Sequence, residues 1–356
     1  MTNSRSNPGT DQIVNAPIKV GVVGCGYWGP NLIRNFAENE KAEVRWICDL
    51  DAKRVAAMKR RYPAAQATAD YESLIADQAL DAVAIATPVG THFSFAKAAL
   101  EAGKNVLLEK PLTASVAEAE QLIALAERNG LTLMVDHTFV YTGAVRKIKE
   151  MVEGGELGEL LYFDATRVNL GLFQDDINVV WDLAPHDLSI MDFVTARQPE
   201  TVTATGSCHI QKRIENIAYV MLRFPDEFIA HFHFNWLSPV KIRHTLLAGR
   251  RKMVVYDDIE PTEKVRVYDS GVTTTRSEDQ LDREAAYRTL VSYRTGDVWV
   301  PKLDSTEALR YVCEEFLAAI SEKRSALTDG YAGLRVVRLL EAAQQSINHG
   351  GRPVKV

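Results

Sequence analysis

The chain has 356 residues, 46% of them hydrophobic and 25% charged, a composition typical of a globular protein with room for two domains. The net charge of −6 and the lack of a long basic run argue against nucleic acid as the main partner. The four cysteines lack the spacing of a disulfide framework or a cysteine zinc site, which favours a reducing cytoplasm. Residues 1–16 are polar, without the apolar segment of a signal peptide, and no run of about 18 apolar residues occurs, so we expect a loose tail and no membrane anchor.

After this tail the chain has the pattern of a dinucleotide-binding unit. Residues 18–23 form a short apolar run typical of a buried parallel strand, and the motif Gly-Cys-Gly-Tyr-Trp-Gly at 24–29 follows at once. A helical segment at 30–37 and a second strand at 43–48 come next, and that strand ends on Asp49. A lone G-x-G-x-x-G motif is a weak signal, but strand, glycines, helix, strand and acid in this order make a strong dinucleotide fingerprint.

Each glycine of the motif has its own physical purpose. Gly24 permits the tight turn out of the strand, Gly26 lets the main chain approach a pyrophosphate, and Gly29 allows close packing of helix on strand. Free N–H groups in the first turn of the following helix then face the phosphates. We expect Tyr27 and Trp28, within the same loop, to contact the cofactor as well. The alternative is a structural turn whose glycines serve packing alone.

Asp49 predicts which dinucleotide binds. Its carboxylate would accept hydrogen bonds from the adenosine ribose hydroxyls, and it would repel a 2′-phosphate. The sequence therefore predicts NAD rather than NADP.

Helices and strands continue to alternate as far as residue 135, which predicts a six-stranded, doubly wound parallel sheet. Such sheets present the carboxyl ends of their strands to the ligand, so Thr87 and Pro88, after the fourth strand, should border the cofactor. The predicted helices are 51–61, 71–75, 91–102 and 115–129, and the further strands are 66–69, 82–86, 105–108 and 131–135.

Glu109, Lys110 and Pro111 follow the fifth strand, at the edge where ligands bind, and we expect Glu109 and Lys110 to contact the cofactor. From position alone, Lys110 could equally be a phosphate or ribose contact or an exposed charge. Its chemical interpretation is a proton carrier or substrate-orienting donor, because an oxidised, cationic nicotinamide lowers the pKa of a nearby lysine.

Past residue 137 the pattern becomes that of an α+β unit with a mostly antiparallel sheet. Its strands have the period of two expected when one face of a sheet is covered, and short turns join them. The predicted strands are 159–168, 219–224, 228–236, 242–248, 252–256 and 264–268, and the helices are 143–153, 305–322 and 329–348. The expected domains are a nucleotide-binding domain at 17–138, a substrate and oligomerisation domain at 139–328, and a last helix within 329–356 that packs back toward the first domain.

Residues 181–188 predict a second chemical group. Pro185 suits the first turn of a helix, and the apolar spacing after it continues that helix. His186 would then lie near a positive helix end, which disfavours the imidazolium and keeps a neutral base available. Asp182 either caps this helix or orients His186.

Together these motifs resemble the Gfo/Idh/MocA family of sugar and polyol oxidoreductases, over nearly the whole chain from about residue 18. The resemblance implies a Rossmann domain followed by an open, mostly antiparallel sheet domain that often mediates oligomerisation. It also implies Lys110 and His186 at the active site, Asp182 beside them, and a cofactor contact by His92. The motifs that carry the likeness are the glycine motif, Ala86-Thr87-Pro88 with His92, Glu109-Lys110-Pro111 and residues 182–186.

Five other residues are candidates for substrate contact. His137 and Tyr141 follow the sixth strand and either line the cleft or pack in the core. Trp181 precedes the second chemical group, while Arg167 and Arg294 lie in the second domain and could hold anionic groups. Ordinary solvated surface is the alternative for both arginines.

No metal site is predicted. His231 and His233 share one strand face, but no third ligand of suitable spacing is visible, so a solvent face or a subunit interface is the favoured interpretation.

Residues 235–241 and 292–297 resemble branches of the family that act on nucleotide-linked sugars, including 3-dehydrogenases of UDP-N-acetylglucosamine-type substrates. We therefore expect an NAD-dependent enzyme that oxidises a secondary hydroxyl, C3 of a nucleotide-activated sugar, with proton transfer by Lys110 and His186. A free sugar or inositol dehydrogenase is the second hypothesis, and a non-catalytic NAD or sugar sensor is the third. The expected partner is a small sugar rather than nucleic acid or membrane, and the expected state is a cytoplasmic homo-oligomer, either dimer or tetramer.

Overall fold

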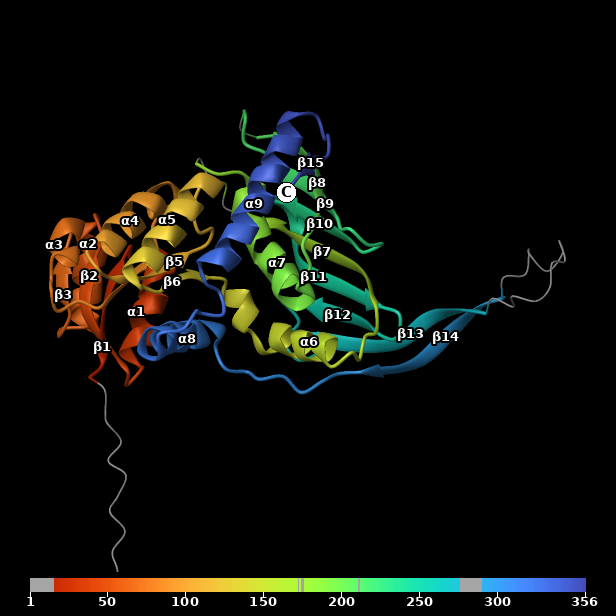
Figure 1. Cartoon of the computed structure of the whole chain (residues 1–356), viewed down its shortest axis with the longest axis horizontal. Coiled ribbons are helices and arrows are strands. Elements are labelled where there is room, and N and C mark those ends of the chain that lie inside the picture. The colour runs from red at the N-terminus through yellow and green to blue at the C-terminus, as the bar shows by residue number, and fades with distance from the viewer. Residues whose placement is uncertain (1–15, 172, 174–175, 211, 276–289) are drawn as a thin grey trace, which may run out of the picture.

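The computed structural model describes residues 16–171, 173, 176–210, 212–275 and 290–356. Two sheets lie beside each other, each with its own helices, and α9 (Gly330–Asn348) runs between them (Figure 1). The tail predicted at 1–16 falls outside the described residues, apart from its last one.

The first sheet has six parallel strands in the order β3-β2-β1-β4-β5-β6, which confirms the doubly wound prediction. Its strand order reverses between β1 and β4, and ligands of such sheets bind at the carboxyl ends of the strands there. Its strands are β1 (Ile18–Val23), β2 (Ala42–Cys48), β3 (Gln66–Thr68), β4 (Ala82–Ile85), β5 (Asn105–Glu109) and β6 (Leu133–Asp136). Its helices are α1 (Gly29–Ala37), α2 (Ala52–Arg61), α3 (Tyr71–Ile75), α4 (His92–Glu101) and α5 (Val116–Asn129), with the 3-10 turns η1 (Val89–Thr91) and η2 (Thr138–Tyr141).

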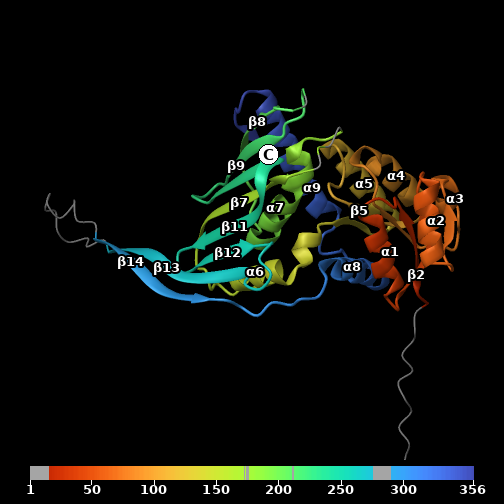
Figure 2. The ribbon, with the colours of Figure 1, turned by 180° about the vertical axis from the view of Figure 1, so that it is seen from behind.

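The second sheet has nine strands in the order β14-β13-β12-β11-β7-β10-β9-β8-β15. Neighbouring strands of this order pair antiparallel in the described residues, except for β7 with β10, which confirms the mostly antiparallel prediction. The β13–β14 hairpin projects away from the first sheet (Figure 2). The strands are β7 (Leu160–Leu170), β8 (Thr201–Ser207), β9 (Ile217–Arg223), β10 (Ile229–Asn235), β11 (Leu237–Gly249), β12 (Met253–Asp257), β13 (Val265–Thr275), β14 (Leu290–Trp299) and β15 (Val354–Lys355).

Helices cover one face of this second sheet. Along β9 and β10, buried and more exposed residues alternate, as the period of two in the sequence predicts. The buried residues pack in one core with α6 (Gly143–Glu153), α7 (Val179–Thr195) and α9. The alternate residues remain accessible, with Tyr219 47% and Met221 41% exposed, so this face of the sheet is open in the single chain.

The last two long helices return to the first sheet. The predicted boundary placed residues 305–322 with the second domain, whereas α8 (Ala308–Glu322) packs against α1, where the rings of Phe36 and Phe316 meet edge to face. α9 packs against α5 and β6 on one side and against α7 and β8 on the other. Both sheets are therefore joined through α9 as well as through the chain crossing after β6.

Among the described helices, none combines the length and the apolar character that crossing a membrane requires.

Candidate active site

The glycine motif forms the turn between β1 and α1 with almost no room to spare at two of its three glycines. Gly24 has φ +91°, and a Cβ there would lie 2.4 Å from the main-chain oxygen of Ala86. A Cβ on Gly29 would lie 1.8 Å from the oxygen of Gly24. At Gly26 the nearest atom is 3.8 Å away, on the Arg54 side chain, so protein packing does not require glycine there. The open main chain at Gly26 fits the close approach of a pyrophosphate.

Asp49 lies against this turn. One carboxylate oxygen accepts a hydrogen bond from the main-chain N–H of Cys25 at 2.5 Å, and the other accepts one from Asp51 N–H at 2.7 Å. The acid at the end of β2 is therefore held beside the glycine motif, where an adenosine ribose binds in this fold. Tyr27 is 82% exposed and Trp28 39% exposed, so both rings are accessible at the same turn.

Lys110 and Asp182 meet although they are far apart in the chain. Lys110 Nζ donates hydrogen bonds to the main-chain oxygen of Asp182 at 2.8 Å and to its carboxylate at 3.3 Å. The second carboxylate oxygen accepts a hydrogen bond from the indole N–H of Trp236 at 3.2 Å. The side chains of Lys110 and Asp182 are 14% and 23% exposed, so they are sheltered but within reach of a ligand.

His186 lies one turn beyond Asp182 on the same face of α7, because residues four apart are neighbours on a helix. The predicted helix start at Pro185 is wrong: α7 begins at Val179, and the Asn178 side chain caps it by accepting from two main-chain N–H groups at 3.1 Å. His186 is therefore inside the helix, and the predicted effect of a positive helix end does not apply. Asp182 lies in the first turn rather than at the cap.

Burial, followed by the charge of Lys110, holds the pKa of His186 well below the ordinary histidine value. Its ring packs edge-on against Phe139 with centroids 4.9 Å apart. Within the described part of the chain, no group hydrogen-bonds its ring nitrogens. His186 is therefore expected to be neutral, as the sequence predicts, but because of burial and the charge of Lys110 rather than a helix end.

Two buried carboxyl groups lie at the carboxyl ends of β5 and β6, next to Lys110. Glu109 and Asp136 are neighbours across β5 and β6, and they are only 8% and 1% exposed. Burial and the adjacent Asp136 raise the pKa of Glu109 well above its usual range. Burial raises the pKa of Asp136 to about 6, although the Thr138 hydroxyl donates to it at 2.6 Å. Both carboxyl groups therefore take up a proton more readily than exposed carboxylates do, and a cofactor contact by Glu109 stays a prediction.

His92 is likewise engaged inside the protein. Its ring is 1% exposed, with one nitrogen 2.9 Å from the oxygen of Thr87 and the other 2.9 Å from that of Pro111. The ring therefore links the segments after β4 and β5, and the predicted direct cofactor contact of His92 does not fit this geometry. The side chain of Thr87 lies nearby, with its hydroxyl 2.7 Å from that of Thr91.

Family models match both parts of the chain. Residues 18–137 match the model described as the oxidoreductase family, NAD-binding Rossmann fold, and residues 145–255 match the GFO/IDH/MocA C-terminal domain. The chain belongs to the Gfo/Idh/MocA family. It is an oxidoreductase whose Rossmann domain binds NAD.

Individual members of the family are similar over most of their length. The chain is 32% identical over 260 residues to an uncharacterised oxidoreductase, YdgJ, of Escherichia coli K12, covering 69% of this chain and 73% of that one. It is 26% identical over 323 residues to UDP-N-acetylglucosamine 3-dehydrogenase of Acidithiobacillus ferrooxidans, covering 90% and 94%. The fold matches the crystal structure of GenD2 from gentamicin A biosynthesis, in complex with NAD, with a TM-score of 0.79, 23% identity and 99% of both chains covered.

Three of the predicted substrate residues have different surroundings in the structure. Trp181 is partly exposed beside Asp182 on α7. Tyr141 packs in the interior, where its hydroxyl lies 2.9 Å from that of Thr328, so the core alternative holds for it. Arg294 pairs with Asp269 on the β13–β14 hairpin, which projects away from the first sheet (Figure 1).

Arg167 is buried rather than solvated. It forms a two-pronged ion pair with Asp187, with both N–O distances 2.8 Å, and these side chains are 3% and 4% exposed. The guanidinium lies over the ring of Phe139, 4.7 Å from its centroid. Arg167 therefore supports the wall of the site through Phe139 and α7.

Two side chains of the site were not among the residues predicted for it from the sequence. Phe139 contacts His186, and Trp236 holds the Asp182 carboxylate. Phe139 follows the carboxyl end of β6, which was a usable signal because ligands bind at that edge. Trp236 lies between β10 and β11 of the other sheet, and the sequence alone gives no indication of that contact.

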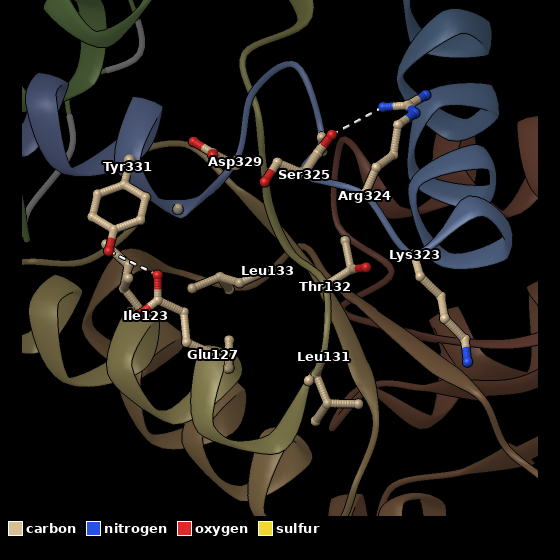
Figure 3. Close-up of a pocket in the computed structure, with 14 residues that line it drawn as sticks. Ile123, Glu127, Leu131, Thr132, Leu133, Lys323, Arg324, Ser325, Asp329 and Tyr331 are labelled. Atoms are coloured by element: carbon tan, nitrogen blue, oxygen red, sulfur yellow. Dashed lines mark hydrogen bonds between the residues drawn. The ribbon is translucent and has the colours of Figure 1, made fainter.

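A separate pocket of about 270 Å³ lies at the opposite edge of the first sheet (Figure 3). It is lined by the end of α5, by Leu133 at the start of β6 and by the segment before α9, and the Tyr331 hydroxyl donates to Glu127 beside it at 2.7 Å. None of the predicted site residues lines this pocket.

Proposed function

We propose that the protein oxidises a secondary hydroxyl, C3 of a nucleotide-activated sugar, with Lys110 and His186 handling the hydroxyl proton. The observation that carries this proposal is the meeting of Lys110, Asp182 and His186 at the carboxyl edge of the NAD-binding sheet. A proton donor or acceptor and an orienting cation beside the cofactor are what an alcohol oxidation requires.

His186 is the general base in this proposal. Its lowered pKa keeps the imidazole neutral at neutral pH, and its ring nitrogens are uncommitted within the described chain. It takes the proton from the hydroxyl as the carbon–hydrogen bond is broken.

Lys110 orients the hydroxyl and stabilises the negative charge that develops on its oxygen. Its ammonium group is held by the main chain and the carboxylate of Asp182, and Trp236 in turn holds that carboxylate. This arrangement leaves one of the three N–H donors of Lys110 for a substrate oxygen.

NAD fits the residues at the other end of the site. Gly26 leaves the main chain open for the pyrophosphate, and Asp49 can receive the ribose hydroxyls. When bound there, NAD supplies the acceptor for the hydride. The same carboxylate disfavours the 2′-phosphate of NADP.

The proposed substrate class rests on similarity to the UDP-N-acetylglucosamine 3-dehydrogenase, which extends over 90% of this chain. Arg243, near the site, also supports an anionic substrate, because it lies over Phe139 and is 32% exposed while pairing with Asp258. We further propose a dimer or tetramer joined through the open face of the second sheet, where Tyr219 stacks on His233 with centroids 4.5 Å apart. Light scattering on the purified chain gives the number of subunits directly.

The test mixes the enzyme, at a concentration comparable to the substrate, with NAD and a panel of UDP-sugars, dTDP-sugars, free sugars and inositols. Absorbance of the reduced nicotinamide is recorded, and the high enzyme concentration reveals a single turnover even when the cofactor stays bound. We expect a signal with nucleotide sugars that His186→Gln abolishes. A signal with free polyols alone would transfer the assignment to the second hypothesis, and NAD binding without turnover would favour a sensor.

A further inference from the structure

A second pocket lies further along the active-site face of α7. We name it the α7–α9 pocket; it has a volume of about 360 Å³, and Ser189, Phe193, Arg335 and His137 are among the residues that line it. Ser189 and Phe193 continue the helix face that carries His186, because each follows the previous residue by three or four positions. The pocket and the active site are thus neighbours along one helix.

His137 lines this pocket and has no role in the reaction as described so far. Its side chain is 2% exposed, and neither ring nitrogen has a hydrogen-bond partner in the described part of the chain. Buried polar groups almost always have partners, and each exception calls for a functional or solvent explanation. A neutral imidazole offers one donor and one acceptor, so His137 can accept a proton at one nitrogen and release one at the other.

The pocket has space and polar groups for water. Its volume corresponds to several water molecules at roughly 30 Å³ each. The Asp192–Arg335 ion pair, with N–O distances of 2.9 to 3.0 Å, and the hydroxyls of Ser189 and Thr328 provide hydrogen-bonding atoms around it. The ring of His137 therefore borders a space that water can occupy.

His137 is also joined to the active site through the chain, because Phe139, two residues later, packs its ring against that of His186. Burial, followed by the positive charges of Arg335 and Lys110, lowers the pKa of His137 to about 3. A charge on His137 would in turn lower the pKa of His186. A ring with so low a pKa does not retain a proton at neutral pH, which suits transfer rather than storage.

We propose that His137 relays the proton of alcohol oxidation from His186 to water in the α7–α9 pocket, which serves as the proton exit. This inference rests on the proposed dehydrogenase function. The substrate O–H bond breaks as an N–H bond forms on His186, and the opposite N–H of His186 passes its proton toward His137. His137 releases a proton from its other nitrogen to water, so both rings return to the neutral state. The electron pair of the broken C–H bond leaves with the hydride.

The first test compares the wild-type chain with His137→Phe, which keeps a ring of similar size without nitrogen. In a stopped-flow single turnover, nicotinamide absorbance follows the hydride and a pH indicator follows the released proton. We expect the signals to coincide in the wild type and the proton to lag by about tenfold or more in the variant, with an unchanged dissociation constant for NAD. Coincident signals in His137→Phe would overturn the relay.

A chemical rescue separates proton transfer from a purely structural role. His137→Ala leaves space for a small ring, and we expect added imidazole to restore proton release while pyrazole, a similar but much weaker base, does not. Equal effects of the two compounds, or no effect of either, would count against the relay. Ala332→Leu fills the pocket from α9 without changing His137, and it should slow proton release in the same way.

A third measurement needs no turnover. It tests access from the pocket to position 137 even when the proposed dehydrogenase function is wrong. If the wild-type enzyme oxidises no sugar in the panel, the proposed function is wrong. The route is then tested by reacting His137→Cys with a small thiol reagent and mapping the modified peptide. We expect rapid modification that Ala332→Leu slows at least several-fold; an introduced thiol that the reagent does not reach excludes the pocket as a proton exit.

Discussion

The Lys110 ammonium lies 2.8 Å from the main-chain oxygen of Asp182, which joins the loop after β5 to the first turn of α7. The contact connects the NAD-binding sheet to the helix that covers the second sheet. Lys110 is therefore placed by both halves of the chain, and small movements between the two sheets would alter the position of its charge.

Replacing Lys110 tests whether that charge takes part in the reaction. Lys110→Met keeps much of the side-chain length but has no hydrogen-bond donor. We expect kcat to fall by on the order of 10² to 10⁴, because orientation and charge stabilisation at the hydroxyl are lost. The dissociation constant for NAD should change only a few-fold in a fluorescence titration.

The matched control is Lys97→Met on α4, an exposed lysine whose ion pair with Glu101 is 3.9 Å long. It should retain full activity, because such surface pairs contribute little. Near-normal turnover of Lys110→Met would contradict the proposed role of Lys110.

The sequence predicts the parts of this fold that depend on local pattern. The glycine motif and the first sheet were found because turn geometry and buried parallel strands leave regular signals. The start of α7 was missed because Pro185 suits a helix start, whereas here it lies inside the helix. Asn178 was the available signal, since asparagine is a good helix cap.

Side-chain partners were harder to predict than elements. No sequence pattern near His92 predicts that its ring contacts the main-chain oxygens of Thr87 and Pro111. The raised pKa values of Glu109 and Asp136 likewise depend on the register of β5 against β6. Contacts of this kind exist only once the chain is folded, so the sequence alone could not predict them.

Asp49→Asn tests the choice of dinucleotide. The amide oxygen can still accept the Cys25 N–H beside the glycine motif, whereas the hydrogen bond from Asp51 N–H and the negative charge are lost. We expect the dissociation constant of NAD to rise roughly tenfold, because hydrogen bonds to a charged acceptor contribute about 1.5–3 kcal/mol. Binding of NADP should improve as the repulsion of its 2′-phosphate disappears.

Parallel titrations with both dinucleotides measure the change in preference. The control is Asp51→Asn. Asp51 lies two residues after Asp49 and caps α2, so this change should leave the ratio of the NAD and NADP dissociation constants unchanged. An unaltered ratio in Asp49→Asn would remove the explanation of NAD preference through Asp49.

Asp136→Asn tests the raised pKa of Asp136. Burial raises the pKa of Asp136 from 3.8 to about 6 in the folded chain, so between these pH values the folded state binds more protons than the unfolded state. The contribution of this group to stability is therefore complete below about pH 4 and is lost as pH rises through about 6. The shift corresponds to roughly 3 kcal/mol at most.

Asparagine has no such titration, and its oxygen can still accept the Thr138 hydroxyl. We expect the free energy of unfolding of Asp136→Asn, relative to wild type, to increase between about pH 4 and pH 6 and then to level off. Urea unfolding across this range measures the difference. Parallel pH profiles for the two proteins would show that folding does not raise the pKa of Asp136.

Gly26 and Gly29 make a paired test of cofactor binding against packing. Gly29→Ala would place a methyl group 1.8 Å from the oxygen of Gly24, so the turn must shift. We expect a loss of about 1–3 kcal/mol in the free energy of unfolding, together with weaker NAD binding. Gly26→Ala meets no atom closer than 3.8 Å and has no positive φ, so its stability should stay within about 0.5 kcal/mol of wild type.

The two variants should nevertheless share the defect in NAD binding. The methyl group of Gly26→Ala would occupy the space that the pyrophosphate needs, and we expect its NAD dissociation constant to rise at least tenfold. Urea unfolding without cofactor, followed by NAD titration of the same samples, separates the two effects. A Gly26→Ala variant that binds NAD normally would mean that the pyrophosphate does not approach the main chain at this glycine.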